Sequence, residues 1–491
     1  MSRIPYKWIV AIVFVAGTFM DILDTTSVNV ALPTLAKEFD ATIPQIEWVV
    51  LGYLLSLAVW IPASGWIGDR FGTKKIYLFA IVMFTGSSML CGAATSLNEL
   101  IAFRILQGVG GGMLVPVGTA MLFRSFPPIE RAKASTVLII PTVLAPALGP
   151  VIGGWLVTYH SWRWIFYLNL PVGIATFLIG LFGLKEHKEP HAGRFDLPGF
   201  LLSGTGLAAI LFALSKGPSD GWGSPIVLVP LIGGLLAFAL LVYVETHVEE
   251  PMLALRLLKE RMFRNANVVT GLAYGSFAGL LFVLPLFLQT LLGLTAIQSG
   301  LTTFPQAVGM ILASQVAGRV YHSVGPRRLV IGGLVAMTLV TLPFAWVGFG
   351  TSLWTIRGLM FLRGICLAFA FVPIQASSYA NIEPQDTGRA SAIYSAQRQV
   401  SASLGVAILA TVLSEAIAHY TGGAANPAGA LDAFQVTFFV AALLIAVAAA
   451  SAFLIRDRDA ASTIRRLAEA DDFVIEDPAP LPYEEERRER R

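Results

Sequence analysis

The feature of this sequence that most limits its fold is a block of about twenty apolar residues, repeated along the whole chain and separated by short polar segments. A helix of that length spans the ~30 Å hydrocarbon core of a bilayer, because each residue advances the helix by about 1.5 Å. Charged residues make up only 13% of the chain, whereas soluble domains carry about a quarter. The sequence therefore predicts an all-α membrane protein.

Fourteen such blocks can be counted, which predicts fourteen transmembrane helices. Nineteen Lys and Arg residues fall in one alternate set of connecting segments before the C-terminal tail, and four fall in the other set: Lys37, Arg163, Lys216 and Arg357. The positive-inside rule then predicts that both termini lie in the cytoplasm. The expected location is the inner (cytoplasmic) membrane of the cell. The expected spans are 8–31, 46–64, 76–97, 99–121, 135–158, 164–184, 198–215, 225–244, 267–291, 298–318, 328–349, 354–378, 390–415 and 434–455.

Two polar segments resemble each other. "GWIGDRFGTKK" begins at Gly65 and "GRVYHSVGPRR" begins at Gly318, and both carry two glycines at the same spacing followed by two cations. Such internal repeats are common in transporters with alternating access. We expect two six-helix bundles with two inserted helices between them, divided as 1–190, 191–250 for the insert, 251–455, and a charged cytoplasmic tail at 456–491.

The first of these segments offers a candidate conformational latch formed by Gly65, Asp69, Arg70 and Gly72. The glycines allow a tight turn and close helix approach, and the carboxylate can accept hydrogen bonds from a helix N-terminus or pair with an Arg. In the second copy His322 replaces the acid, so a weaker latch is expected there. The alternative is an ordinary solvated turn with positive-inside charges.

Few ionisable residues lie within the apolar blocks, and each is a candidate functional residue because burying a charge in a membrane is expensive. The main candidates are Asp21, Asp24, Arg104, Arg363 and Arg398. Asp24 and Arg104 should lie at similar depths, roughly 8 to 10 Å below the outer surface at ~1.5 Å per residue. We expect them to pair, and the pair to act as a proton switch; the alternative is a fixed structural ion pair.

Asp21 lies one helical turn deeper than Asp24 on the same face. It could relay protons, bind a cation, or remain neutral and hydrogen-bond to Thr18 or Thr25. Phe-rich and Leu-rich blocks predict a roomy substrate pocket. Its candidate polar residues are Asp21, Thr25, Gln107, Arg363 and Arg398.

The block 135–158 contains "GPVIGG", from Gly149 to Gly154. Gly149 and Gly153 form a small-residue face that admits a neighbouring backbone, and Pro150 removes a helical hydrogen bond. A kinked, tightly packed helix is expected, although Gly and Pro are common in membrane helices for packing alone. No nucleophile with a matching base and no metal-ligand spacing is recognisable, so we expect no enzyme activity, no cofactor and no metal site.

Several segments in this order resemble the fourteen-helix drug:proton antiporters (EmrB/QacA type) of the major facilitator superfamily. They are "LDTTSVNVALP" at 23–33, "GWIGDRFGTKK" at 65–75, "RILQG" at 104–108, "GPVIGG" at 149–154 and "SWRWIFYLNLPVG" at 161–173. The resemblance implies proton coupling through Asp24 and Arg104, and an antiporter helix with Gly149, Pro150, Gly153 and Gly154.

The implied function is proton-coupled export of hydrophobic or amphipathic, monocationic or neutral small molecules such as drugs. The expected partners are these substrates, protons and membrane lipids, with no nucleic acid. Arg363 and Arg398 support an alternative, export of an anionic amphiphile or lipid-like metabolite. A channel or a membrane-embedded enzyme is less favoured, and Glu415 alone gives little support for export of divalent cations.

Overall fold

The computed structural model describes residues 5–189, 195–248, 253–421 and 426–464. Within these ranges the chain is a bundle of long antiparallel helices, and the secondary structure assigned there contains no strand. The predicted all-α structure is confirmed for these residues. Most of the predicted tail, 465–491, lies outside the described residues, as does the start of the expected insert at 191–194.

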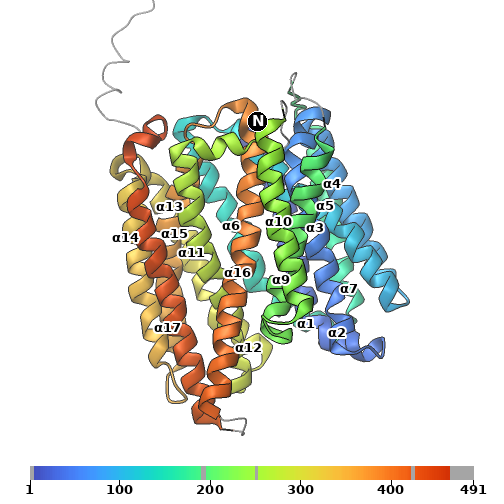
Figure 1. Ribbon diagram of the computed structural model, residues 1–491, viewed down its shortest axis with the longest axis vertical. Helices are drawn as coiled ribbons and strands as arrows, with labels where there is room; N and C mark the ends of the chain where they lie inside the picture. Colours follow the sequence, from blue (N-terminus) through green and yellow to red (C-terminus); the bar gives the residue numbers. More distant parts are fainter. Residues whose placement is uncertain (1–4, 190–194, 249–252, 422–425, 465–491) are drawn as a thin grey trace, which may run out of the picture.

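The N-terminal helices (blue to cyan) and the C-terminal helices (yellow to red) form two groups in Figure 1. Each group supplies six spans, one of which consists of two consecutive helices, and short helical turns lie between them. The N-terminal spans are α1 Tyr6–Glu38, α3 Trp48–Phe71, α4 Thr73–Ala93, α5 Leu97–Ser125, α6 Arg131–Tyr159, and the pair α7 Arg163–Tyr167 and α8 Asn169–Gly183. The C-terminal spans are α11 Arg261–Leu286, α12 Ala296–Thr303 with α13 Pro305–Val324, α14 Pro326–Thr341, α15 Leu353–Ser378, α16 Thr387–Thr421 and α17 Pro427–Ser451. The short turns are α2 Ile43–Ile46, η1 Pro128–Glu130, η2 Leu255–Lys259, η3 Phe287–Leu291, η4 Leu342–Trp346, η5 Pro384–Asp386, η6 Ala452–Leu454 and η7 Asp457–Thr463.

Two further helices lie between the groups in the chain: α9 Leu197–Asp220 and α10 Pro225–His247. They pack against each other, and α9 also contacts α3 and α16, so the inserted pair touches both groups. In Figure 1 they stand between the N-terminal and C-terminal helices. α10 has only 17% of its most apolar window buried, as expected for a helix that faces lipid.

Thirteen helices of the described chain are long and apolar enough to cross a membrane. The fourteenth expected span, 298–318, is broken into α12 and α13 at Phe304. Pro305 begins α13 and has no N–H to continue the hydrogen bonding of the preceding helix. The expected span is thus present as two consecutive helices, and the φ and ψ of Phe304 between them are helical.

The repeated polar segments are mostly helical rather than loops. α3 continues to Phe71, and Gly72 alone, with φ of +108°, separates it from α4. In the second copy Gly325, with φ of +85°, separates α13 from α14 in the same way. A helix continues past the membrane as long as its backbone hydrogen bonds are made, so the end of an apolar block did not mark the end of the helix.

The halves meet along α6, which contacts α13 and α15, and along α16, which contacts α3 and α5. Hydrogen bonds cross this contact from Thr136 to the Ser314 carbonyl (3.2 Å) and from Ser391 to the Pro116 carbonyl (2.6 Å). The start of α1 and the end of α17 lie at the same end of the bundle, uppermost in Figure 1. We call this the terminal end; which side of the membrane it faces remains a prediction.

Candidate functional site

A buried ion pair joins α1 to α5. Arg104 Nη1 lies 2.5 Å from Asp24 Oδ2, and neither side chain is exposed. The guanidinium also donates from Nε to the Val49 carbonyl (3.1 Å) and from Nη1 to Gln107 Oε1 (2.7 Å), and it stacks over the Tyr53 ring at 4.3 Å. The structure thus brings together the two residues that sequence analysis selected as a pair.

Two amides complete the surroundings of the Asp24 carboxylate. Asn169 Nδ2 donates to Asp24 Oδ1 (2.8 Å) and contacts Ser88 Oγ (3.0 Å), and Gln107 Nε2 donates to the same carboxylate oxygen at 3.2 Å. Gln107 is therefore part of the ion-pair network. Sequence analysis missed Asn169, although a polar amide between apolar residues in "YLNLPVG" was a usable signal.

Within the described chain, the Asp21 carboxyl forms neither of the hydrogen bonds considered from sequence, to Thr18 or to Thr25. The Tyr53 hydroxyl donates to Asp21 Oδ1, whereas the Thr25 hydroxyl donates to the Asp21 backbone carbonyl at 3.1 Å. Thr18 Oγ1 is buried without a partner among the described residues. Tyr53 thus contacts both the Asp21 carboxyl and the Arg104 guanidinium, so one ring links the two acidic positions of α1.

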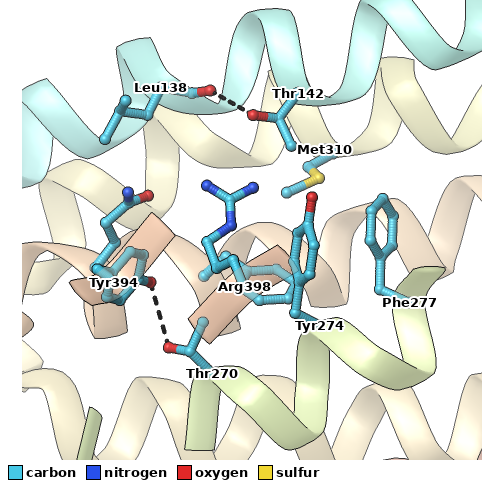
Figure 2. Close-up of a pocket in the computed structure, with 10 residues that line it drawn as sticks. Leu138, Thr142, Thr270, Tyr274, Phe277, Met310, Tyr394 and Arg398 are labelled. Carbon is cyan, nitrogen blue, oxygen red and sulfur yellow. Dashed lines mark hydrogen bonds between the residues drawn. The ribbon is translucent and has the colours of Figure 1, made fainter. Parts of the chain in front are cut away.

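A cavity of about 140 Å³ lies between the halves, with walls from α1, α3, α5 and α6 on one side and α11 and α16 on the other. Asp21 lines it from the N-terminal half and Arg398 from the C-terminal half. Figure 2 shows the Arg398 guanidinium pointing from α16 toward α6, beside Tyr274, whose ring lies 4.4 Å from the guanidinium carbon. Opposite charges therefore face one central space.

The other predicted pocket residues do not line this cavity. Arg363 is 1% exposed, and its Nη1 donates to Gln306 Oε1 at 2.5 Å. Its Nε and Nη2 have no hydrogen-bond partner among the described residues. Thr25 bonds to its own helix and Gln107 to the ion pair, so of the five predicted residues Asp21 and Arg398 line the cavity.

The expectation of a roomy pocket does not hold in this conformation. Pockets for drug-sized ligands usually measure ~300–1,000 Å³, whereas the central cavity measures about 140 Å³. The adjoining space drawn in Figure 2, which shares Arg398 and Tyr274 with the cavity, adds about 20 Å³.

At the terminal end, the predicted latch residues have separate environments. Asp69 Oδ1 pairs with Arg124 Nη2 at 2.8 Å, and the Arg124 Nε donates to the Pro384 carbonyl of the other half at 3.2 Å. A Cβ added to Gly65 would lie 2.7 Å from the Gly388 carbonyl oxygen, so the backbones of the two halves nearly touch there. Arg70 is exposed, and Gly72 supplies the positive-φ turn.

The expected antiporter helix packs directly on α1. Ser27 Oγ donates to the Gly149 carbonyl at 3.1 Å, and a Cβ on Gly149 would collide with Thr26. A Cβ on Gly153 would lie 3.0 Å from Ser27, whereas one on Gly154 would meet only Val30, at 3.8 Å. Pro150 lies inside α6, which remains one helix from Arg131 to Tyr159. The Gly149 and Gly153 face therefore sets the separation of α1 and α6.

Two six-helix groups, a buried ion pair in one of them and a charged cavity between them define a membrane transport protein. The sequence profile of the Major Facilitator Superfamily matches residues 14–406 and, overlapping with these, 266–484. The chain therefore belongs to that superfamily; it is a multi-pass membrane transporter for small molecules and not an enzyme.

Named relatives support the same assignment. The putative multidrug resistance protein MdtD of Cronobacter sakazakii is 36% identical, over 90% of this chain and 92% of its own. The multidrug resistance protein B homolog of Mycobacterium tuberculosis is 34% identical, over 83% and 76%, and the uncharacterized MFS-type transporter YhcA of Bacillus subtilis is 32% identical, over 84% and 77%. The crystal structure of the human organic anion transporter MFSD10 shares the fold, with a TM-score of 0.63 at 16% identity, over 90% of this chain and 100% of that one. The resemblance to the multidrug branch of the superfamily is thus confirmed.

Proposed function

We propose that this protein exports hydrophobic or amphipathic small molecules, cationic or neutral, in exchange for protons across the cytoplasmic membrane. Relatives named for multidrug resistance, at 34% to 36% identity, support the substrate class. The Asp24–Arg104 pair, fully removed from solvent, is the observation that supports proton coupling.

The proposed coupling follows from the cost of an unpaired charge in the membrane interior. While Arg104 touches Asp24, the guanidinium compensates the negative charge of the carboxylate. If the N-terminal half rearranges and the Arg104 guanidinium moves away, the Asp24 carboxylate becomes stable only when a proton neutralises it. Protonation would thereby follow conformation, and each proton entering down a membrane potential supplies about 2.3 kcal/mol per 100 mV.

Proteoliposomes with an imposed proton gradient and ethidium as a cationic probe would test this proposal. Asp24→Asn keeps the shape and one of the two acceptor oxygens, but it cannot exchange a proton. We expect it to bind ethidium and to lose gradient-driven transport. Asp40→Asn is the matched control, because Asp40 is exposed and its φ of +46° is one that Asn also tolerates. Undiminished gradient-driven transport by Asp24→Asn would refute the coupling role.

Arg363 gives a second candidate function, export of an anionic amphiphile. Two of its guanidinium nitrogens lack hydrogen-bond partners in the described chain. After a rearrangement, an anionic ligand could accept hydrogen bonds from them. An anionic dye compared with ethidium separates the two functions. The second candidate would be favoured if the unaltered protein transported the anionic dye but not ethidium. Arg363→Gln or Arg398→Gln should then abolish transport of the dye.

A further inference from the structure

A lateral groove lies outside the proposed transport path. It measures about 960 Å³ and is bounded by α3, α9, α10, α16 and the turn η2. It contains neither Asp21 nor Arg398, and its lining comes mostly from the inserted pair and from α16. The groove is therefore separate from the central cavity and much larger.

Cations gather at the terminal end of this groove. Lys259, Arg256 and Arg389 line it. Arg256 pairs with both oxygens of Asp386 (2.7 and 2.9 Å), and Arg389 lies 3.9 Å from the same carboxylate. Lys259 is exposed and forms no ion pair within the described chain. Lys259 thus gives the mouth of the groove one cation that no carboxylate of the described chain neutralises.

One acid lines the groove beside these cations. Glu245 is 6% exposed, near the end of α10. Its Oε1 accepts a hydrogen bond from the Leu253 amide at 3.0 Å, while Oε2 is buried and has no partner in the described chain. Leaving a buried carboxylate oxygen without a donor is costly, so a donor supplied by a ligand would be stabilising.

The depth of the groove matches one leaflet. Its lining on α16 extends from Arg389 to Ser401, which is ~18 Å of helix at 1.5 Å per residue, close to half of the ~30 Å hydrocarbon core. Beyond the charged mouth the walls are mostly apolar, with Leu207, Phe238 and Val400 among them, and Gln397 and Ser401 add polar groups at the far end. A charged end at headgroup level and apolar walls below it have the polarity profile of a phospholipid.

We propose that this groove binds a phospholipid with a primary amine in its headgroup, such as phosphatidylethanolamine. The phosphate lies against Lys259 and Arg256, the ammonium donates to Glu245, and an acyl chain fills the apolar part between α9, α10 and α16. A choline headgroup has no N–H to give to Glu245, and a glycerol headgroup has no positive charge to offer it. The site therefore selects the amine.

Native mass spectrometry of the purified full chain tests the proposal, with palmitoyl-oleoyl phosphatidylethanolamine, phosphatidylcholine and phosphatidylglycerol as probes. We expect the unaltered protein to retain the ethanolamine lipid about tenfold better than the choline lipid, the size of one charge-assisted hydrogen bond. Glu245→Gln should remove that preference. Lys259→Gln, at an exposed position that should not affect folding, should weaken retention of all three lipids.

Two controls remove equivalent charges outside the groove. Lys133→Gln changes a cation whose side chain is 57% exposed, and Glu383→Gln changes an exposed acid; both should leave lipid retention unchanged. Equal retention of ethanolamine and choline lipids by the unaltered protein would overturn the proposal, and so would tighter binding of phosphatidylglycerol. A dimer or a bound polypeptide that excludes lipid from the groove would overturn it as well.

Discussion

The Asp24 carboxylate has donors on both of its oxygens. Arg104 contacts Oδ2, and Asn169 and Gln107 contact Oδ1. A buried ion pair persists only where such additional hydrogen bonds compensate for lost water. The corresponding cation of the C-terminal half, Arg363, donates a hydrogen bond to Gln306 alone among the described residues. The two halves therefore share a helical framework but differ in the chemistry at its centre.

At this scale we predict that Asn169→Leu destabilises the N-terminal half. The substitution removes donors to Asp24 and Ser88 and leaves a buried carboxylate short of one partner, at a cost of about 1–3 kcal/mol. Thermal unfolding in detergent should show a lower midpoint. Asn29→Leu serves as the control. Because Asn29 is exposed on α1, this substitution should leave the unfolding midpoint unchanged. Equal midpoints for both variants would contradict the prediction.

Pairing of Asp24 with Arg104 could be predicted from sequence because so few charges occur in the apolar blocks. The roles of Asn169 and Tyr53 could not, because their contacts depend on the rotation of α8 and α3 about their axes. The rotation of α5 about its axis likewise decides that Gln107 bonds to the ion pair and does not line the central cavity.

At the scale of the helix, each half uses the same device at its glycine turn. The segment after α8 brings Glu186 Oε1 to the Lys74 amide (3.0 Å), and the segment after α17 brings Asp457 Oδ1 to the Arg327 amide (2.9 Å). Both acids sit at a helix N-terminus, where free N–H groups and the helix dipole favour a negative charge. The repeat therefore includes a capping acid that the aligned sequence segments do not contain.

For α6 we predict that Gly149→Ala lowers both transport and thermal stability, whereas Gly154→Ala changes neither. A methyl group on Gly149 must displace Thr26 on α1, whereas Gly154 has room for one. Gradient-driven ethidium transport and the unfolding midpoint should both fall for Gly149→Ala alone. Similar effects at the two positions would show that the small-residue face has no special packing role.

At the scale of the whole molecule, polar and backbone contacts join the halves at the terminal end. Arg124 reaches both Asp69 of its own half and the Pro384 carbonyl of the other, and Gly65 lies against Gly388. We propose that residues 1–190 and 251–455 move as two units. When this contact separates, the central cavity opens toward the terminal end.

We therefore predict that Arg124→Ala favours the conformation open at the terminal end. Spin labels on Lys75→Cys and Arg328→Cys, both exposed at the starts of α4 and α14, report the separation of the halves. The two buried native cysteines, Cys91 and Cys366, are replaced by Ala in this background. The distance distribution should shift to longer values, whereas Arg319→Ala, at an exposed position on α13, should leave it unchanged. An unaltered distribution for Arg124→Ala would argue against the latch.

The sequence by itself determined that this chain spans a membrane as helices, because apolar blocks of bilayer length permit no other way to satisfy the backbone. It also determined the duplicated plan and the embedded ion pair, since charges in such blocks are rare enough to have few possible partners. Tertiary structure decided the rest: which polar side chain meets which, where the helix of the second copy breaks, and that α9, α10 and α16 enclose a charged groove. These features depend on helix rotation and on contacts between segments far apart in the chain, which no local pattern of residues records.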